Sequence, residues 1–289
     1  MSSPSFADLG VSRPAVQALA SRGVTNPFPV QRLVVPDVLA GCDVLVKSPT
    51  GSGKTLAFGL PLVDLVADAK RRPAALVLAP TRELAAQIVD ELRGPAHARA
   101  CSITAVYGGT GLARQSRLAG RAHALVATPG RLEDLIERGA VSLAHVQLLV
   151  LDEADRMLDM GFEADIRAIL ANAPDSRQTL LFSATFPDAI RALSRGFQRD
   201  PVEVTVQSTV AADALEQWFH EVPAAHRFEA LATLLAREDA AAAVVFCNTR
   251  KDVQEVADAL WKRGFAALAL HGDLEQRERD EVLVRFANG

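Results

Sequence analysis

A short run of residues near position 50 has the types and spacing of a loop that binds phosphate groups. Residues 48–55 read Ser-Pro-Thr-Gly-Ser-Gly-Lys-Thr, between an apolar run and a segment with helical periodicity. Gly51 and Gly53 allow successive N–H groups to face the phosphates of a nucleotide, while Lys54 neutralises the β- and γ-phosphates and Thr55 holds Mg²⁺. The predicted nucleotide-binding residues are Ser48, Pro49, Thr50, Gly51, Ser52, Gly53, Lys54 and Thr55, with Ser48 standing where the general pattern has its first glycine.

Residues 152–155, Asp-Glu-Ala-Asp, supply the carboxylates that a magnesium nucleotide needs. They follow the apolar run 146–151. Asp152 is the expected partner of the metal, through water, and Glu153 is placed to polarise the attacking water. Acidic residues there also stabilise the first turn of a helix, a structural role that is compatible with catalysis. Lys54, Asp152 and Glu153 together predict a hydrolase of ATP or GTP.

The elements that must position these residues are short apolar runs that alternate with helical segments. Strands are predicted at 43–46, 74–78, 103–107, 124–127, 146–151, 179–182, 202–206, 242–246 and 266–270. Helices are predicted at 55–69, 82–92, 153–170 and 250–263. This alternation is typical of an α/β fold in which helices cover both faces of a parallel sheet. Because ligands of such sheets bind beyond the carboxyl ends of the strands, we expect the chemistry there.

The composition excludes several classes of protein. The chain has 289 residues, 49% of them hydrophobic, and a net charge of −4, as in soluble globular proteins and unlike disordered or fibrous ones. Only 5% of residues are aromatic, which disfavours recognition by stacking bases along a sheet. Cys42, Cys101 and Cys247 lack paired spacing, and no apolar run approaches the roughly 18–20 residues of a membrane span. These features predict a cytoplasmic protein.

Charge and length divide the chain near residues 205–215. Residues 1–209 carry 22 Lys and Arg against 21 Asp and Glu, whereas residues 210–289 carry 9 against 14. The second segment has 80 residues and two strand–helix repeats. We therefore expect one complete domain followed by a shorter, acidic one.

With its other motifs, the Asp-Glu-Ala-Asp tetrad resembles the DEAD-box ATP-dependent RNA helicases over nearly all of the chain. Residues 23–31 resemble the Q motif of that family, with Phe6 at the place of its upstream aromatic residue and Phe28 in place of a threonine. The resemblance implies that Gln31 pairs with adenine, that Phe6 stacks on it and that Asp155 belongs to the ATP site. It also implies a Q-motif region at 1–32, a RecA-like ATP-binding lobe at 33–209 and a partial second RecA-like lobe at 210–289.

Further motifs imply contacts with RNA and a link between ATP and lobe movement. Residues 183–185, Ser-Ala-Thr, resemble the motif that ties the acidic residues to lobe movement, which makes Ser183 and Thr185 candidate catalytic residues. The RNA-binding candidates offer hydroxyls, glycine backbone or guanidinium groups to phosphate and ribose oxygens, so the recognition is largely independent of RNA sequence. They are Pro80, Thr81, Arg82, Gly108, Gly109, Thr128, Pro129, Gly130, Arg131, Asn248, Thr249, His271, Gly272, Gln276 and Arg279. Taken alone, Thr81 and Thr128 are equally good helix caps.

The resemblance sets the expected activity and its limits. It implies a monomeric enzyme that uses ATP and Mg²⁺ to remodel RNA or unwind it locally, and residues 274–280 and 286–289 most resemble a bacterial subgroup that acts on ribosomal RNA. The family's later Ala-Arg-Gly-x-Asp and His-Arg-x-Gly-Arg-x-Gly-Arg motifs do not occur in this sequence. Arginines of that kind are worth about 10³–10⁵ in rate, so the resemblance implies a truncated chain that binds Mg·ATP with crippled RNA-stimulated hydrolysis. A DNA-directed helicase and an ATP-dependent RNA clamp without turnover stay open as alternatives.

Overall fold

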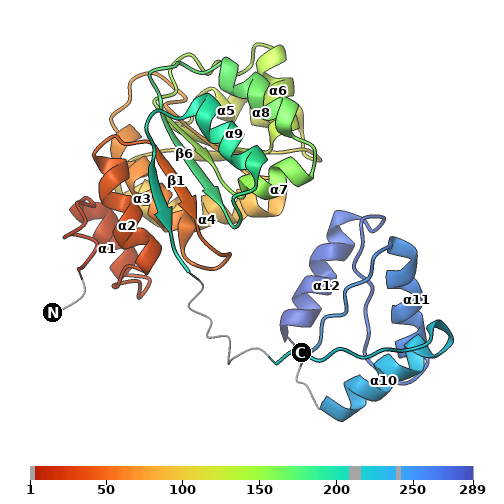
Figure 1. Ribbon diagram of the computed structural model, residues 1–289. Coiled ribbons are helices and arrows are strands. Elements are labelled where there is room, and N and C mark those ends of the chain that lie inside the picture. The colour runs from red at the N-terminus through yellow and green to blue at the C-terminus, as the bar shows by residue number, and fades with distance from the viewer. Residues whose placement is uncertain (1–3, 208–215, 239–241, 289) are drawn as a thin grey trace. The chain divides into compact units, whose positions relative to one another are not determined.

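The computed structural model describes residues 4–207, 216–238 and 242–288 of the chain (Figure 1). The chain divides into two compact units, residues 1–211 and residues 212–289. Within the described residues, no helix is long and apolar enough to cross a membrane.

The first unit is built on a seven-stranded parallel sheet, which confirms the predicted α/β fold class and the first seven predicted strands. The strand order is β3-β4-β2-β5-β6-β1-β7. Near one edge of the sheet, Val44 of β1 lies opposite Leu180 of β6 and Val202 of the edge strand β7. The strands are β1 (Val44–Lys47), β2 (Ala75–Leu78), β3 (Ile103–Val106), β4 (Ala124–Ala127), β5 (Leu148–Leu151), β6 (Gln178–Ser183) and β7 (Val202–Thr205).

Helices cover both faces of this sheet and bury a separate hydrophobic cluster on each (Figure 1). Alternate residues of one strand enter different clusters, as Val44 and Leu45 of β1 do, because side chains alternate across a sheet. One face packs on α1 (Arg13–Ala20), α2 (Pro29–Leu39), α3 (Lys54–Val66) and α4 (Arg82–Ala98). The other packs on α5 (Leu112–Ala119), α6 (Pro129–Glu137), α7 (Ala154–Asp159), α8 (Glu163–Ala171) and α9 (Asp188–Phe197).

The single helix predicted at 153–170 is wrong, because the structure has two helices there. α7 ends at Asp159 and α8 begins at Glu163. Between them Gly161 has a φ of +85°, a left-handed conformation that glycine adopts readily and that ends a right-handed helix. The periodic pattern continues across the break because α7 and α8 bury residues in the same cluster.

The second unit consists of helices joined by extended segments. A short 3₁₀ helix, η2 (Ala224–His226), precedes α10 (Arg227–Glu238), α11 (Arg250–Trp261) and α12 (Gln276–Asn288). The strands predicted at 242–246 and 266–270 are wrong, since neither segment pairs in a sheet within the described residues. A strand needs a neighbour, and in the first unit β1 and β2 are separated by β5 and β6. Two strand–helix repeats with that topology supply no adjacent pair.

We predict that limited proteolysis removes the second unit before it cleaves the first. Among the described residues of the second unit, Ala257 and Leu260 are the only buried hydrophobic residues, while Phe219 and Phe246 are more than 90% exposed. Few buried contacts give a low free energy of local opening. Mass spectrometry of a trypsin time course should show a stable fragment that ends at Arg227, the first tryptic site after Arg199, while the residues beyond it are cleaved. Equal lifetimes of the two units would contradict this expectation.

Candidate nucleotide and RNA site

The loop between β1 and α3 has the conformation predicted for a phosphate-binding loop. Gly51 and Gly53 have φ values of +75° and +88°, and α3 begins at Lys54 directly after the loop. The Ser48 backbone N–H donates to the Ser183 carbonyl of the neighbouring β6 at 3.0 Å. Ser48 has no positive φ, so the absence of a glycine there costs nothing in backbone strain. Thr50 and Thr55 lie in the same loop and first helical turn.

Lys54 is 93% buried at the start of α3, although lysine is rarely buried without a partner. Its ammonium group lies 3.3 Å from the Ser48 carbonyl oxygen. The Ser52 hydroxyl donates to the Pro49 carbonyl at 2.8 Å and also lies 2.5 Å from the Ser48 hydroxyl. These bonds hold the loop closed over the lysine. A buried ammonium ion beside free backbone N–H groups at a helix N-terminus is suited to an anion with several negative charges.

Gln31 connects the start of α2 to the end of the phosphate-binding loop. Its side-chain oxygen accepts from the Phe28 N–H at 2.7 Å, and its Nε2 donates to the Gly53 carbonyl at 2.9 Å. A Cβ at Gly53 would lie 2.5 Å from Nε2 of Gln31 and 2.8 Å from Cδ2 of Phe28. Glycine is therefore required at position 53 for its positive φ and for space. The amide of Gln31 adjoins the nucleotide loop, where adenine recognition was predicted.

The two aromatic residues of the Q-motif region differ in their exposure. Phe6 is 1% exposed and packs in the hydrophobic cluster of α1–α4. Phe28 is 53% exposed, although it adjoins Gln31 and Gly53. The stacking of Phe6 on adenine stays a prediction, and a base would reach that ring only after the groups covering it had moved.

Asp152 is a buried carboxylate at the carboxyl end of β5. It is 2% exposed, and its Oδ1 accepts from the Glu153 N–H at 3.0 Å. Burial raises the pKa of Asp152 to about 6, and the nearby Lys54 opposes this by favouring the charged form. A carboxylate that is desolvated to this extent fits a site for a divalent cation, since a bound cation stabilises the charged form and oxygen ligands suit Mg²⁺.

Glu153 has a strained backbone that its sequence context does not reveal. Its φ and ψ are both +50°, in the left-handed region, at the residue before α7. For a residue other than glycine this costs on the order of 1–3 kcal/mol, and such strain gathers at functional sites. The Glu153 carboxylate is paired with Arg156 at 3.2 Å. The turn therefore directs two successive carboxylates, those of Asp152 and Glu153, out of the end of β5.

The end of β6 contacts both the phosphate-binding loop and the acidic turn. Thr185 donates to Oδ2 of Asp155 from its N–H and from its hydroxyl, both at 2.9 Å. This segment, whose resemblance to a family motif implied a link to the acidic residues, is therefore hydrogen-bonded to one of them. Burial opposes ionisation of Asp155, but the hydrogen bonds from Thr185, Ser183 and Arg156 together outweigh it and leave the Asp155 pKa below its usual value. The Ser183 hydroxyl donates to the Thr185 carbonyl at 2.6 Å, and its own carbonyl accepts from Ser48.

Three of the predicted RNA motifs come together beyond the carboxyl ends of β2, β3 and β4. The Thr81 hydroxyl caps α4 by accepting from the Leu84 N–H at 3.2 Å, as one of its two readings predicted. Arg82 lies against Gly109, where an added Cβ would be 3.2 Å from its guanidinium nitrogen. Gly109 has a φ of +81°, and the neighbouring Gly108 has open space around it. Thr128 is the N-cap residue of α6 without a side-chain cap bond, and Pro129, Gly130 and Arg131 form its first turn.

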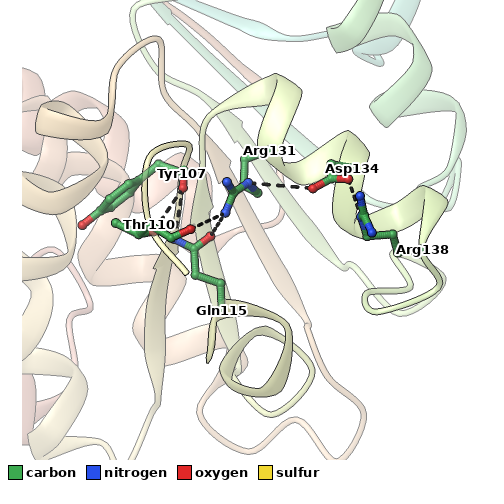
Figure 2. A network of polar contacts seen from close by, with 6 residues as sticks. All are labelled: Tyr107, Thr110, Gln115, Arg131, Asp134 and Arg138. Carbon is green, nitrogen blue, oxygen red and sulfur yellow. Dashed lines mark hydrogen bonds and ion pairs between the residues drawn. The ribbon is translucent and has the colours of Figure 1, made fainter. Parts of the chain in front are cut away.

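A network of polar contacts joins the glycine loop to α6 (Figure 2). The Arg131 guanidinium donates to the Thr110 carbonyl at 3.2 Å and to Oε1 of Gln115 at 3.0 Å. Gln115 in turn donates to the Tyr107 carbonyl at 3.0 Å. Asp134 lies 3.9 Å from Arg131 and 2.5 Å from Arg138. The network fixes the direction of the Arg131 side chain. Arg131 is the one long cation among the RNA-binding candidates at residues 128–131.

Sequence reasoning missed Gln115. It is 7% exposed and lies at the centre of the network, but in the sequence it is a glutamine in an ordinary polar helical segment. We predict that Gln115→Leu weakens binding of single-stranded RNA about 5- to 20-fold, because Arg131 loses the acceptor that orients it. Fluorescence anisotropy with labelled RNA measures this. Gln17→Leu, at an exposed glutamine on α1 of the same unit, is the matched control. Equal RNA affinity of the two variants would contradict the role.

In the second unit, the candidate residues of two motifs also lie together. Thr249 caps α11 by accepting from the Asp252 N–H at 3.1 Å, and the exposed Asn248 precedes it. Arg279 donates to the Gly272 carbonyl at 2.6 Å, and His271 lies 3.4 Å from Gln254. Arg250, beside Thr249, pairs with Asp273 at 2.5 Å and so connects the two motifs. Gln276 begins α12, and its side chain lies outside the described part of the structure.

The comparisons with known proteins agree with this geometry. The family model of the DEAD/DEAH box helicases matches residues 28–193, and that of the helicase conserved C-terminal domain matches residues 226–289. The chain therefore belongs to the DEAD/DEAH box helicase family.

Individual relatives cover the same length of this chain. This chain is 49% identical over 288 residues to the ATP-dependent RNA helicase DbpA of Escherichia coli. The match covers 98% of this chain and 63% of that protein. It is 42% identical to the ATP-dependent RNA helicase DeaD of Klebsiella pneumoniae, covering 98% of this chain and 45% of the relative. A crystal structure of a DEAD box protein from Methanococcus jannaschii matches with a TM-score of 0.68 and 36% identity, covering 98% of this chain and 77% of that one. The chain thus spans less than two thirds of these two curated relatives.

Proposed function

We propose that this chain provides the ATP-binding and RNA-binding surfaces of an ATP-dependent RNA helicase. The observation that carries the proposal is the bridge formed by the end of β6. Ser183 accepts from the phosphate-binding loop, and Thr185 bonds to Asp155 of the acidic turn. A change at the phosphates is thereby coupled to the acidic turn, as a nucleotide-driven conformational switch requires.

The residues of the site take distinct roles in this proposal. Lys54 and the backbone N–H groups of residues 50–55 bind the phosphates, and Gln31 selects adenine. Glu153 accepts a proton from the attacking water, for which its carboxylate at the end of β5 is suited. Asp152 and Thr55 hold Mg²⁺, which neutralises charge on the phosphates when it is bound. Thr185 and Ser183 connect Asp155 of the acidic turn to the phosphate-binding loop.

RNA binds, in this proposal, along the carboxyl ends of β2, β3 and β4. Arg82, Gly109 and Arg131 adjoin one another there through the contacts of Arg82 with the glycine loop and of Arg131 with Thr110. A guanidinium group and backbone N–H groups bind phosphate and ribose oxygens, which differ little between sequences. The second unit, taken by itself, offers the cluster around Arg250 and Arg279 as a further group of RNA-binding candidates.

Stimulation of ATP hydrolysis by RNA and by DNA tests the proposal. Turnover is measured with the chain alone, with single-stranded RNA and with single-stranded DNA of the same sequence. The proposal expects binding of RNA in preference to DNA and turnover that depends on ATP rather than GTP. Equal stimulation by DNA would favour the DNA-directed helicase. ATP-dependent RNA binding with no turnover, even in a chain completed with the family's later arginine motifs, would favour the RNA clamp.

Narrower assignments follow from the same resemblance. We infer a division into a Q-motif region at 1–32, a RecA-like lobe at 33–209 and a second lobe at 210–289, and a cytoplasmic monomer. The similarity of residues 274–280 and 286–289 to a subgroup acting on ribosomal RNA supports ribosomal RNA as the substrate. Competition between ribosomal RNA fragments and unrelated RNA of equal length tests that choice.

A further inference from the structure

A cationic hollow lies where the strands begin, at the end of the sheet opposite the nucleotide site. None of the sequence motifs includes its residues. Its volume is about 420 Å³. Three segments line it, and each leads into one of the neighbouring strands β2, β5 and β6. Those segments contribute Lys70 and Arg71, then His145 and Gln147, and then Ser176, together with Ala144, Val146 and Pro174.

The floor of the hollow is held by the sheet itself. The Gln147 N–H donates to the Ala74 carbonyl at 2.7 Å, and the Gln178 N–H donates to the Gln147 carbonyl at 2.8 Å. These bonds join the first residues of β2, β5 and β6 across the sheet. The part of the hollow formed by Gln147 is therefore anchored in the sheet, while Lys70 and Arg71 are exposed residues of the segment before β2.

The cations at this edge have no carboxylate partners. Within the described residues, no ion pair involves Lys70, Arg71, Arg72, Arg121 or Arg199. Arg72 instead donates to the Arg121 carbonyl at 3.0 Å, and Arg199 donates to the Ser176 carbonyl at 3.3 Å, so both guanidinium groups lie along the same edge.

The acidic groups near the hollow are few, and some are already engaged. Asp175, between two lining residues, is exposed and attracts Arg177. Asp43 is buried and accepts from two backbone N–H groups, and Asp68 lies 3.7 Å from Arg99. Asp200 is exposed beside Arg199. The first unit as a whole is nearly neutral, so an excess of unpaired cations at one edge marks a local binding surface.

We propose that this hollow binds the phosphate backbone of RNA outside the strand held by the motifs. This inference rests on the proposed RNA function. Arg71 lies four residues before β2 and Thr81 lies three residues after it, so β2, a strand of four residues, separates the two surfaces. A strand of that length spans roughly 13 Å, a distance that an RNA chain passing around the unit can cover. Such contacts depend on the phosphate charge and not on the base sequence. They therefore increase the affinity of the chain for longer RNA, and salt weakens this contribution.

The test compares RNA lengths in a charge-reversed variant. Lys70→Glu with Arg71→Glu is measured by anisotropy with labelled unstructured RNA of about 10 and about 40 nucleotides, lengths below and above one binding site. We expect at least about tenfold weaker binding of the long RNA, unchanged binding of the short RNA, and a log–log salt slope smaller by about 2. Arg13→Glu with Arg93→Glu, which makes the same charge change on exposed residues of α1 and α4, is the control.

Further outcomes separate this inference from the proposed function. Lys70→Gln with Arg71→Gln removes the charges without reversing them and should give a smaller loss in the same direction. Unchanged ATP affinity shows that the variants are folded. If the charge-reversed variant matches its control on the long RNA, the hollow is not an RNA site, although the proposed function stands. If the unaltered chain binds neither RNA, the proposed function fails. Displacement of long RNA by polyglutamate of equal charge as readily as by RNA itself would overturn RNA in favour of an acidic protein segment.

Discussion

Glu153→Gln is expected to abolish ATP turnover while leaving ATP binding intact, in a version of the chain completed with the family's later arginine motifs. The substitution keeps the size of the side chain but removes the carboxylate that accepts the proton from water. General base catalysis is worth about 10²–10⁴ in rate, so the loss should fall in that range. ATP affinity should change little because the phosphates contact Lys54 and the backbone of the loop. Single-turnover hydrolysis and equilibrium binding, measured on the same preparation, separate the two effects.

The matched control for this prediction is Glu163→Gln. Glu163 pairs with Arg167 at 2.9 Å on α8, as Glu153 pairs with Arg156 on α7, but Glu163 begins a helix that follows no strand end. The control therefore removes a comparable exposed ion pair. Unchanged turnover in Glu153→Gln, or an equal loss in both variants, would show that Glu153 is not the base.

Lys54→Ala is expected to weaken ATP binding by about 10- to 150-fold. Hydrogen bonds to a charged group are worth about 1.5–3 kcal/mol each, and one such bond accounts for this range. Lys54 is 93% buried, so the alanine variant loses a costly buried charge and should be at least as stable to heat as the unaltered chain. Calorimetric titration with ATP gives the affinity, and a thermal melt gives the stability.

Lys47→Ala is the control for the lysine prediction. Lys47 is exposed at the end of β1, one residue before the loop begins, so it changes the charge near the site by the same amount. ATP binding should be nearly unchanged in this variant. If Lys54→Ala binds ATP as tightly as Lys47→Ala does, the loop is not the phosphate site.

The architecture of the first unit was predictable because it depends on patterns of several residues. The inner strands β2, β4 and β5 are apolar runs that are buried along their whole length, as parallel strands covered on both faces are. The edge strand β7 instead alternates between Val and polar residues. The nucleotide loop was predictable in detail, since Gly51 and Gly53 have the positive φ values that their residue type permits. The bond between Thr185 and Asp155 agrees with the resemblance of residues 183–185 to the family motif that is tied to the acidic residues.

Other features of the site depend on contacts that one sequence does not encode locally. Gln115 matters because Arg131, sixteen positions away, reaches its side-chain oxygen. The left-handed backbone at Glu153 contradicts the local preference of glutamate, so tertiary structure imposes it. The exposure of Phe28 and the burial of Phe6 are likewise set by packing.

The second unit shows the same limit in another way. The runs at 242–246 and 266–270 have the composition of strands, but strand pairing is a property of two segments. Neither run has a paired neighbour among the described residues, so β-propensity alone predicts too much there.

The central claim is that the first unit binds Mg·ATP at the loop of residues 48–55 and reads adenine through Gln31. The direct measurement is calorimetric titration of the 289-residue chain with ATP and with GTP in the presence of Mg²⁺, repeated with Gln31→Ala. The account predicts one ATP site per chain, at least about tenfold weaker binding of GTP, and loss of that difference in the variant. Absence of ATP binding, or equal affinity for ATP and GTP in the unaltered chain, would contradict it.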